Sequence, residues 1–295
     1  VAVGHLALST LNAGADAYNV AIGFQAARLM NTGLGNIVIG GFAGDALTSG
    51  HRNIAIGYEA LSTEDAHGYN IAIGYRALAT QDAGANAYNV AIGAEAGYAI
   101  TTGKESVIIG GLAGDALTTG TRNTLIGHTA GSALVEGGSN VAVGYQALLS
   151  EDAHGANTAI GYNTLATQNA GANAFNVAVG YNAGTAVTTG VQNTVVGAQA
   201  GDALTTGSGN VAIGFDALGA EDAHGRNVAI GHLTLQSQNA GADAYNTAVG
   251  YSAGIAMTTG TNNTLIGGLA GDALTTGSFN VAIGKAALST EDGNG

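Results

Sequence analysis

Residues 53–61 read Asn-Ile-Ala-Ile-Gly-Tyr-Glu-Ala-Leu, and their first five residues decide the fold because the chain repeats them throughout its length. The phrase Asn, then Val, Ile or Thr, then a small or apolar residue, then Ile or Val, then Gly occurs seventeen times in 295 residues. One copy has Ser106 in place of Asn, and the first copy lacks its Asn. The glycines that close the phrase lie 17 residues apart, or 19 at regular intervals. A period this short and strict predicts a solenoid in which each repeat is one coil stacked on the last.

Numbering a coil from its Asn gives several positions a physical interpretation. Val and Ile are stiff at χ1 and favour strands, so the first four positions predict a short β-strand. The fifth position is always Gly, which suits a corner that needs positive φ or close backbone approach. We expect such corners at Gly23, Gly57, Gly93, Gly127, Gly161, Gly197, Gly231 and Gly267.

The third position bears on assembly. It is Ala in twelve coils and a larger apolar residue in five, while the second and fourth positions point to the opposite face of the strand. Both faces are therefore apolar in most coils, as in strands that are covered on both sides. The interior of the coil covers one face, and neighbouring chains are the simplest cover for the other. The sequence thus predicts an all-β parallel β-solenoid of about 17 coils that associates with other copies.

The coils also follow a higher order. Three 17-residue coils and one 19-residue coil make a 70-residue super-repeat, and one extra coil lies near residues 127–143. We therefore expect one continuous repeat array over residues 1–295, with no capping segment at either end. The coils that begin and end the sequence are nearly in phase, which suggests end-to-end polymerisation. Coils with a bulky third residue carry Gly at the ninth position, which looks like volume compensation within one layer.

Composition narrows the function classes. The sequence has 50 glycines and no Pro, Cys or Trp, so disulfides, thiol catalysis and Cys-ligated zinc are excluded. Its net charge is −13 and its seven Lys and Arg residues are spread singly, which argues against a nucleic-acid partner. No run of about 18 apolar residues exists, so no membrane span is expected.

The asparagines at the first position are predicted to form a ladder. Stacked about 4.8 Å apart, each side-chain amide could bond to the next, as in other parallel stacks. Such a ladder would fix the register, which Ala-rich strands specify weakly. The ladder would comprise Asn19, Asn36, Asn53, Asn70, Asn89, Asn123, Asn140, Asn157, Asn176, Asn193, Asn210, Asn227, Asn246, Asn263 and Asn280.

Three corners combine carboxylates with an imidazole, and these residues are weak candidates for a metal site. Oxygen and nitrogen ligands of this kind could hold a divalent ion. The corners lie four or five coils apart, so one chain cannot gather them into one site, and we predict solvated acidic corners without a cofactor. A fourth copy, 291–293, has lost its His. The candidates are Glu64, Asp65, His67, Glu151, Asp152, His154, Glu221, Asp222 and His224.

Three other recurring groups have competing interpretations. Asp45, Asp115, Asp202 and Asp272 are explained without a ligand by an Asp that bonds to its own turn backbone, and calcium binding is the lesser alternative because no calcium-loop pattern is present. Paired threonines such as 118–119 raise the remote alternative of an ice-binding solenoid. An aromatic residue precedes the Asn that follows each 19-residue coil. The favoured interpretation is that it fills a local hydrophobic gap, and the alternative is a lateral contact or a glycan platform; these residues are Tyr18, Tyr88, Phe175 and Tyr245.

Residues 157–165, Asn-Thr-Ala-Ile-Gly-Tyr-Asn-Thr-Leu, and 140–148, Asn-Val-Ala-Val-Gly-Tyr-Gln-Ala-Leu, resemble head repeats of YadA-like trimeric autotransporter adhesins. They are even more similar to repeat arrays of phage tail fibres. The resemblance covers the whole chain and implies a parallel β-roll or β-helix in a homotrimer that is intertwined or side by side. It also implies an elongated shaft or an adhesive head outside the cell, on the cell surface or on a virion.

These observations together favour a structural function. We predict a structural fibre protein that is not an enzyme, because the chain distributes the same groups along an axis instead of converging different groups on one point. The partners would be further copies of the chain. The alternative is an adhesin head that binds a host receptor or glycan, with its specificity in two stretches that break the repeat, 28–35 and 132–139.

Overall fold

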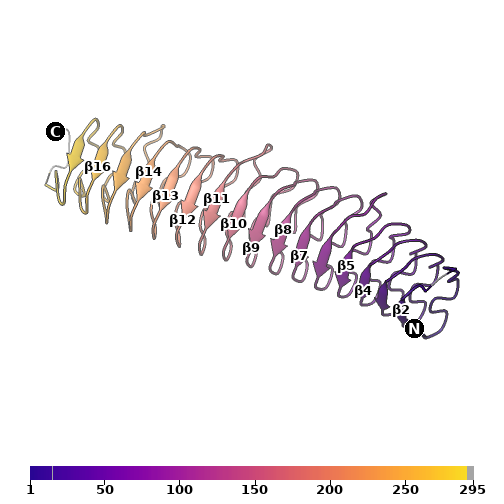
Figure 1. Cartoon of the computed structure of the whole chain (residues 1–295). Coiled ribbons are helices and arrows are strands. Elements are labelled where there is room, and N and C mark those ends of the chain that lie inside the picture. The colour runs from indigo at the N-terminus through magenta and orange to yellow at the C-terminus, as the bar shows by residue number, and fades with distance from the viewer. Residues whose placement is uncertain (15, 291–295) are drawn as a thin grey trace. The chain divides into compact units, whose positions relative to one another are not determined.

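The computed structural model describes residues 1–14 and 16–290 and divides into two compact units, Val1–Gln146 and Ala147–Gly295. Each unit is a parallel β-solenoid, so the predicted all-β fold is confirmed (Figure 1). The prediction of one array over residues 1–295 stays a prediction. The described residues contain no helix, and accordingly no helix that could cross a membrane.

Each coil contributes one strand of two or three residues from the first phrase of the repeat. The first unit contains β1 (Ala2–Val3), β2 (Val20–Ile22), β3 (Ile37–Ile39), β4 (Ile54–Ile56), β5 (Ile71–Ile73), β6 (Val90–Ile92), β7 (Val107–Ile109), β8 (Thr124–Ile126) and β9 (Val141–Val143). The second contains β10 (Thr158–Ile160), β11 (Val177–Val179), β12 (Thr194–Val196), β13 (Val211–Ile213), β14 (Val228–Ile230), β15 (Thr247–Val249), β16 (Thr264–Ile266) and β17 (Val281–Ile283).

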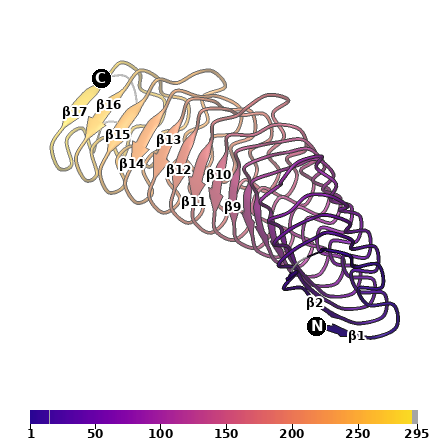
Figure 2. The ribbon, with the colours of Figure 1, turned by 45° about the vertical axis from the view of Figure 1, so that its right-hand side comes forward.

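Neighbouring strands within a unit pair in parallel and in register. Ala55 pairs with Ala72 and Ile56 with Ile73, so equivalent positions of successive coils stack on one another. The stacked strands of the second unit are visible as parallel arrows in Figure 2. This register is what turns a sequence repeat into continuous rows of like residues along each unit.

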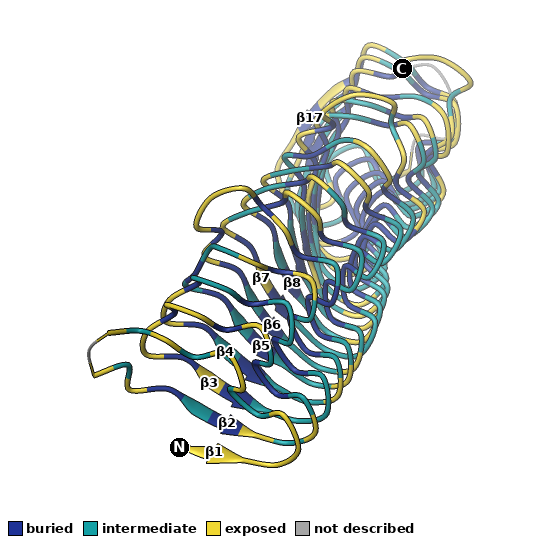
Figure 3. Cartoon of the chain, turned by 90° about the vertical axis from the view of Figure 1, so that its right-hand side faces the viewer, coloured by how far each residue is buried: buried dark blue, intermediate teal, exposed yellow. Residues whose placement is uncertain are grey.

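The two faces of the strands have different surroundings. The third position points inward and is fully buried, as at Ala55, Ile108 and Val38. The second and fourth positions point outward and are half-buried or exposed, with Ile37 at 38% and Val107 at 36% exposure (Figure 3). The predicted alternation is thus present, and the outer face of the sheet is an open row of β-branched side chains that are Val or Ile except for Thr at the second position of five coils.

The corner glycine at the fifth position has two reasons to be Gly. Gly57 has φ 137°, a conformation that L-residues with side chains rarely adopt. A Cβ on Gly57 would also lie 2.2 Å from the carbonyl oxygen of Gly74 in the next coil. The expected corners at Gly23, Gly93, Gly127, Gly161, Gly197, Gly231 and Gly267 share this conformation, with φ between 135° and 138°.

After the corner, the backbone alternates between right- and left-handed conformations. Glu59 at the seventh position has φ 53° and Leu61 at the ninth has φ 51°. The peptide N–H of Glu59 donates to Gly41 in the preceding coil, and that of Leu61 donates to Ala77 in the following coil. Forty described residues other than Gly have positive φ, and Thr129 is the only β-branched one among them, as expected from the steric cost of branching there.

The interior is filled by the third, ninth and twelfth positions together. A Cβ on Gly114, at the ninth position, would lie 2.7 Å from Cδ1 of Leu125, a bulky third-position residue of the next coil. A Cβ on Gly44 would lie 2.7 Å from Cδ1 of Leu47, which is buried at the twelfth position. Coils with Gly at the ninth position therefore fill the same layer from the third and twelfth positions, which accounts for the compensation expected from the sequence.

Candidate functional site

The first-position asparagines line up inside the coils, and their side chains bond mainly to the backbone. The predicted amide-to-amide bond is present between Asn36 and Asn19, where Nδ2 donates to Oδ1 at 3.2 Å. The side-chain Oδ1 of Asn36 accepts the peptide N–H of Asn53 at 2.8 Å, and the side-chain Nδ2 of Asn36 donates to the carbonyl of Gly50 at 2.8 Å. Each of these asparagine side chains thus makes one hydrogen bond within its own coil and one to the backbone of the next coil. The reason is that a side-chain oxygen can satisfy the peptide N–H next to each strand, which would otherwise be buried and unpaired. Ser106 keeps half of this role, since its Oγ accepts the N–H of Asn123 at 3.2 Å.

The outer face of the sheet continues into a row of aromatic rings at the sixth position, which the sequence analysis did not single out. Tyr58 stacks on Tyr75 with ring centroids 5.9 Å apart. In the second unit, Tyr162 stacks on Tyr181 at 5.2 Å, and His232 stacks on Tyr251 at 5.3 Å. Tyr58 and Tyr75 are 45% and 48% exposed, respectively. We call the outward second and fourth positions together with these rings the outer apolar face.

The aromatic residues that precede the asparagines do not fill hydrophobic gaps, contrary to one of the two interpretations. Tyr18 is 80% exposed, and Tyr88 is exposed while stacked on Tyr69 with centroids 5.1 Å apart. The guanidinium of Arg226 lies over the ring of Tyr245, 5.4 Å from its centroid. These rings lie on the surface because the residue before the Asn has positive φ, which turns its side chain outward.

The threonine pairs use their hydroxyls within the solenoid. The Oγ1 of Thr118 donates to the carbonyl of Val135 at 2.9 Å, and that of Thr188 donates to Thr205 at 3.2 Å. The first hydroxyl of each of these pairs is thus bonded to the backbone of the next coil.

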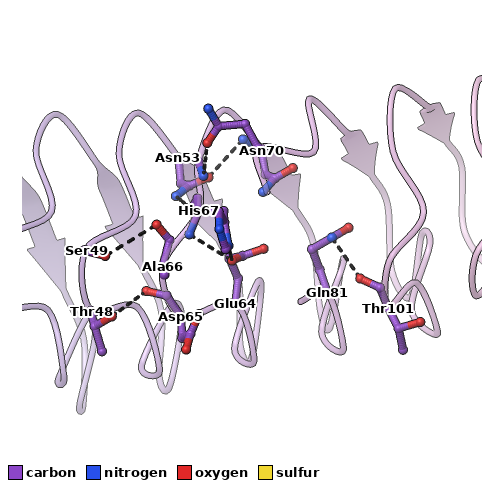
Figure 4. Close-up of polar contacts among 12 residues, drawn as sticks. Thr48, Ser49, Asn53, Glu64, Asp65, Ala66, His67, Asn70, Gln81 and Thr101 are labelled. Atoms are coloured by element: carbon purple, nitrogen blue, oxygen red, sulfur yellow. Dashed lines mark hydrogen bonds and ion pairs between the residues drawn. The ribbon is translucent and has the colours of Figure 1, made fainter. Parts of the chain in front are cut away.

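The carboxylate and imidazole corners are not wholly solvated, so that prediction is wrong for their glutamates. Glu64 occupies the twelfth position, which carries Leu, Ile, Met or Val in several coils and Gln in three of the 19-residue coils, and it is fully buried. Its Oε1 accepts the peptide N–H of His67 at 3.0 Å and lies 3.4 Å from Nδ1 of the same imidazole (Figure 4). Asp65 is exposed, as predicted.

The structure adds a residue to this corner that the sequence analysis missed. Asp82, from the coil that follows, brings a carboxylate oxygen to the group, and Glu64, Asp65, His67 and Asp82 each offer a ligand atom within 4.8 Å of the others. The same grouping recurs without a fourth member at Glu151, Asp152 and His154 and at Glu221, Asp222 and His224. Only stacking in register could have revealed Asp82, which lies 15 residues from His67 in the sequence. The fourth copy of the motif, 291–293, lies outside the described residues.

Burial governs the electrostatics of these corners. It raises the pKa of the Glu64, Glu151 and Glu221 carboxyls, because the charged form loses its hydration inside the coil. The peptide N–H of the histidine three residues later, and the imidazole itself, oppose the shift in each case. Asp82 adds to the rise in the pKa of Glu64 through like-charge repulsion.

The two stretches expected to break the repeat follow it in the structure. Met30, in 28–35, is buried at the twelfth position like its counterparts, and the N–H of Gly35 donates to Ala17 at 2.8 Å. Leu134, in 132–139, is buried in the same layer, and the N–H of Ser139 donates to Thr121 at 2.9 Å. The stretches differ in composition, and the backbone accommodates both because the twelfth position only requires a side chain of suitable volume.

Comparisons with protein-family models, with curated proteins and with solved structures found no match to this chain.

Proposed function

We propose that this chain is a structural repeat protein that builds the shaft of an extracellular, cell-surface or virion fibre by associating laterally with further copies of itself. The observation that supports this proposal is the outer apolar face. Its rows of Val and Ile are half-exposed along both units, and stacked aromatic rings border them. Exposed apolar surface that continues over many coils is typical of interaction sites.

The composition of the face supports association with an identical chain. Because the face repeats every coil, two or three copies aligned in parallel would match row to row, as isologous or cyclic assemblies require. A homotrimer is the assembly that the resemblance to trimeric adhesin heads and tail fibres implies. Many weak contacts of one kind would then add up along the shaft through avidity.

The test is the solution mass of the purified chain, measured by light scattering together with negative-stain images. A mass near three times 28.7 kDa, in short rods, supports a trimeric shaft, and open-ended filaments would support end-to-end polymerisation. A variant with Ile37→Lys and Val107→Lys should be monomeric, because two charges on the face would be desolvated at the contact. The matched control has Thr at the same two positions, since Thr124 and Thr158 show that strands of this chain accept Thr there. A monomeric wild-type protein would contradict the proposal.

An adhesin that binds a glycan or a host receptor is the second candidate, and one feature favours it. A hollow in the first unit is lined by Phe42, Tyr58, Asp45, Glu59 and Ser62. An aromatic face can stack on a sugar ring, and carboxylates beside it can accept hydrogen bonds from the hydroxyl groups of the sugar. Glycan-array binding that is lost in Tyr58→Ala and kept in Tyr162→Ala would favour the adhesin. If the wild-type protein binds no glycan, the fibre shaft is the better supported function.

A further inference from the structure

The buried twelfth position is occupied by an apolar side chain in some coils and by a glutamate in others. Leu47 and Leu117 fill it in coils with Gly at the ninth position, and Glu64 and Glu221 fill it in two coils with Leu there. A buried carboxylate is costly unless it is paired or coordinates a cation. The buried glutamate therefore requires a compensating group in the same layer of the coil.

The hydrogen bonds of the described residues provide only part of that compensation. Oε1 of Glu64 accepts the N–H of His67 at 3.0 Å, and the backbone N–H of Ala83 also favours the charged carboxyl. Oε2 of Glu64 and Oε2 of Glu221 are buried and accept no hydrogen bond of good geometry within residues 1–14 and 16–290. The Nδ1 atoms of His67 and His224, which face these carboxylates, are likewise buried without a hydrogen-bond partner in that part of the chain. In both corners one ligand atom each of the glutamate, the histidine and the neighbouring aspartate lies within 4.8 Å of the others.

The fold holds the backbone around the histidine from both sides. The side-chain Nδ2 of Asn53 donates to the carbonyl of His67 at 3.0 Å, and the N–H of Gly68 donates to Oδ1 of Asn86 at 3.0 Å. Asn86 lies in the 19-residue coil that follows. In the second unit, Asp243 of the following 19-residue coil accepts the N–H of Gly225 at 3.1 Å. The long coil thus supplies the acceptor that fixes the corner of the coil before it.

From this geometry we infer that each of the three corners is a binding site for a divalent first-row transition ion such as Zn²⁺. Oε2 of the buried glutamate and Nδ1 of the histidine are the inner ligands, and the exposed aspartate completes the set from the solvent side. The ligand types select the class of ion, because imidazole with carboxylates suits zinc and its neighbours, whereas Ca²⁺ and Mg²⁺ prefer all-oxygen sites.

The three corners differ in the number of carboxylates that each contains. Asp82 stands beside the first corner, whereas the equivalent position of the following coil is Asn169 for the second corner and Asn239 for the third. With a neutral imidazole, the first corner carries three carboxylates and the others carry two. The first corner should consequently bind the ion most tightly, since an additional anionic ligand strengthens attraction to a dication.

The test is titration of the full chain with ZnCl₂, after EDTA treatment and its removal, by isothermal calorimetry and by counting bound zinc after dialysis. We expect saturable binding of up to three ions per chain. Asp82→Asn should weaken the tightest site by at least the roughly 10–100-fold that loss of an outer-shell partner costs. The triple variant His67→Gln, His154→Gln, His224→Gln should bind no zinc, and the control His128→Gln, outside the corners, should bind like the wild type.

Each other outcome has a defined meaning. Between one and three zinc ions, all lost in the triple variant, support the sites, and an unchanged circular dichroism spectrum shows that the variant is folded. If the triple variant does not fold, His67→Gln alone should lower the zinc count by one. No saturable binding by the wild type, unchanged zinc binding by the histidine variants, or equal affinity for Ca²⁺ would overturn the inference. The result does not depend on the proposed lateral association, because it can be read from monomers and oligomers alike.

Discussion

Oδ1 of Asn36 accepts the peptide N–H of Asn53, one coil further along the stack, at 2.8 Å. The same bond joins Asn53 to Asn70 at 2.9 Å and Asn193 to Asn210 at 2.9 Å. Both partners are buried, so the bond has no competing water. Because the acceptor is a side chain of one coil and the donor is the backbone of the next, the row sets the register in which coils stack.

We expect Asn53→Ala to destabilise the first unit by about 1–3 kcal/mol, the cost of leaving a buried polar group unpaired. The substitution removes the acceptor for the N–H of Asn70 and the donor to the carbonyl of His67. Chemical denaturation followed by circular dichroism would measure the loss. Asn53→Ser is the matched control and should cost less, because Ser106 shows that a hydroxyl can accept the next N–H. Equal losses for Ala and Ser would contradict the assigned role.

Replacement of the corner glycines should be far more disruptive than replacement of glycines in open turns. In Gly57→Ala, the new Cβ would lie 2.2 Å from the backbone of Gly74 at a φ of 137°, so the coils must separate locally. Gly84→Ala makes a sharp control, since Gly84 also has positive φ, 62°, but nothing lies within 4 Å of its Cβ position.

We expect Gly84→Ala to cost about 1 kcal/mol from backbone strain alone. Gly57→Ala should cost well above the roughly 1–3 kcal/mol typical of one strained residue, because the clash is with backbone. Thermal unfolding of both variants would compare them, and similar midpoints would show that the coil spacing relaxes easily.

Much of this fold could be predicted from the sequence, because a repeat that aligns with its own strand period leaves few alternatives. The strand at positions 53–56, the corner at Gly57 and the inward Ala55 all follow from residue type and spacing. The positive φ at Leu61 could not be predicted, since Leu rarely adopts that conformation in isolation and only the stacked hydrogen bonds impose it.

The corner clusters could be predicted only in part. The sequence places Glu64, Asp65 and His67 together, yet acidic residues in a turn normally face water. The inward direction of Glu64 depends on the twelfth position being an interior position, which Leu47 and Leu117 indicate only when the coils are aligned by that position. Asp82 joins the cluster through coil stacking, and no local signal marks it.

The ninth and third positions should be energetically coupled. Gly114→Ala would place a Cβ 2.7 Å from Cδ1 of Leu125 and overpack the layer, at a cost of about 1–3 kcal/mol. Leu125→Ala would leave a cavity and cost about 2–5 kcal/mol. The double variant should be more stable than the sum of the two losses implies, because the added methyl occupies part of the vacated volume.

A double-mutant cycle from urea denaturation would measure this coupling. The control cycle combines Gly114→Ala with Leu204→Ala, which lies in the other unit and should give additive losses. Additivity in the Gly114 and Leu125 cycle would show that the two positions do not share volume.

The unfolding free energy should fall as the pH rises through the range just above the ordinary pKa of an aspartate. Burial raises the pKa of Asp115 above its usual value of 3.8, and nearby Glu95 acts in the same direction. Between the ordinary and the raised pKa, the folded state binds more protons than the unfolded state, so a rise in pH costs folding free energy. The sign is opposite to that of an ion-paired carboxylate, whose pKa is lowered.

Asp115→Asn removes this titration, so its plot of unfolding free energy against pH should be flatter above the ordinary pKa than that of the wild type. At pH 7 the variant should be at least as stable as the wild type, because it removes a partly buried charge while the Asn side-chain oxygen can still accept the backbone N–H groups of residues 115 and 116. Asp45→Asn is the matched comparison: burial also raises the pKa of Asp45, but Arg28 lies 3.9 Å away and opposes that shift. The Asp45 variant should therefore gain less stability at pH 7, since it deprives Arg28 of its partner. Parallel pH profiles for the wild type and Asp115→Asn would show that the carboxyl titrates alike in the folded and unfolded chain.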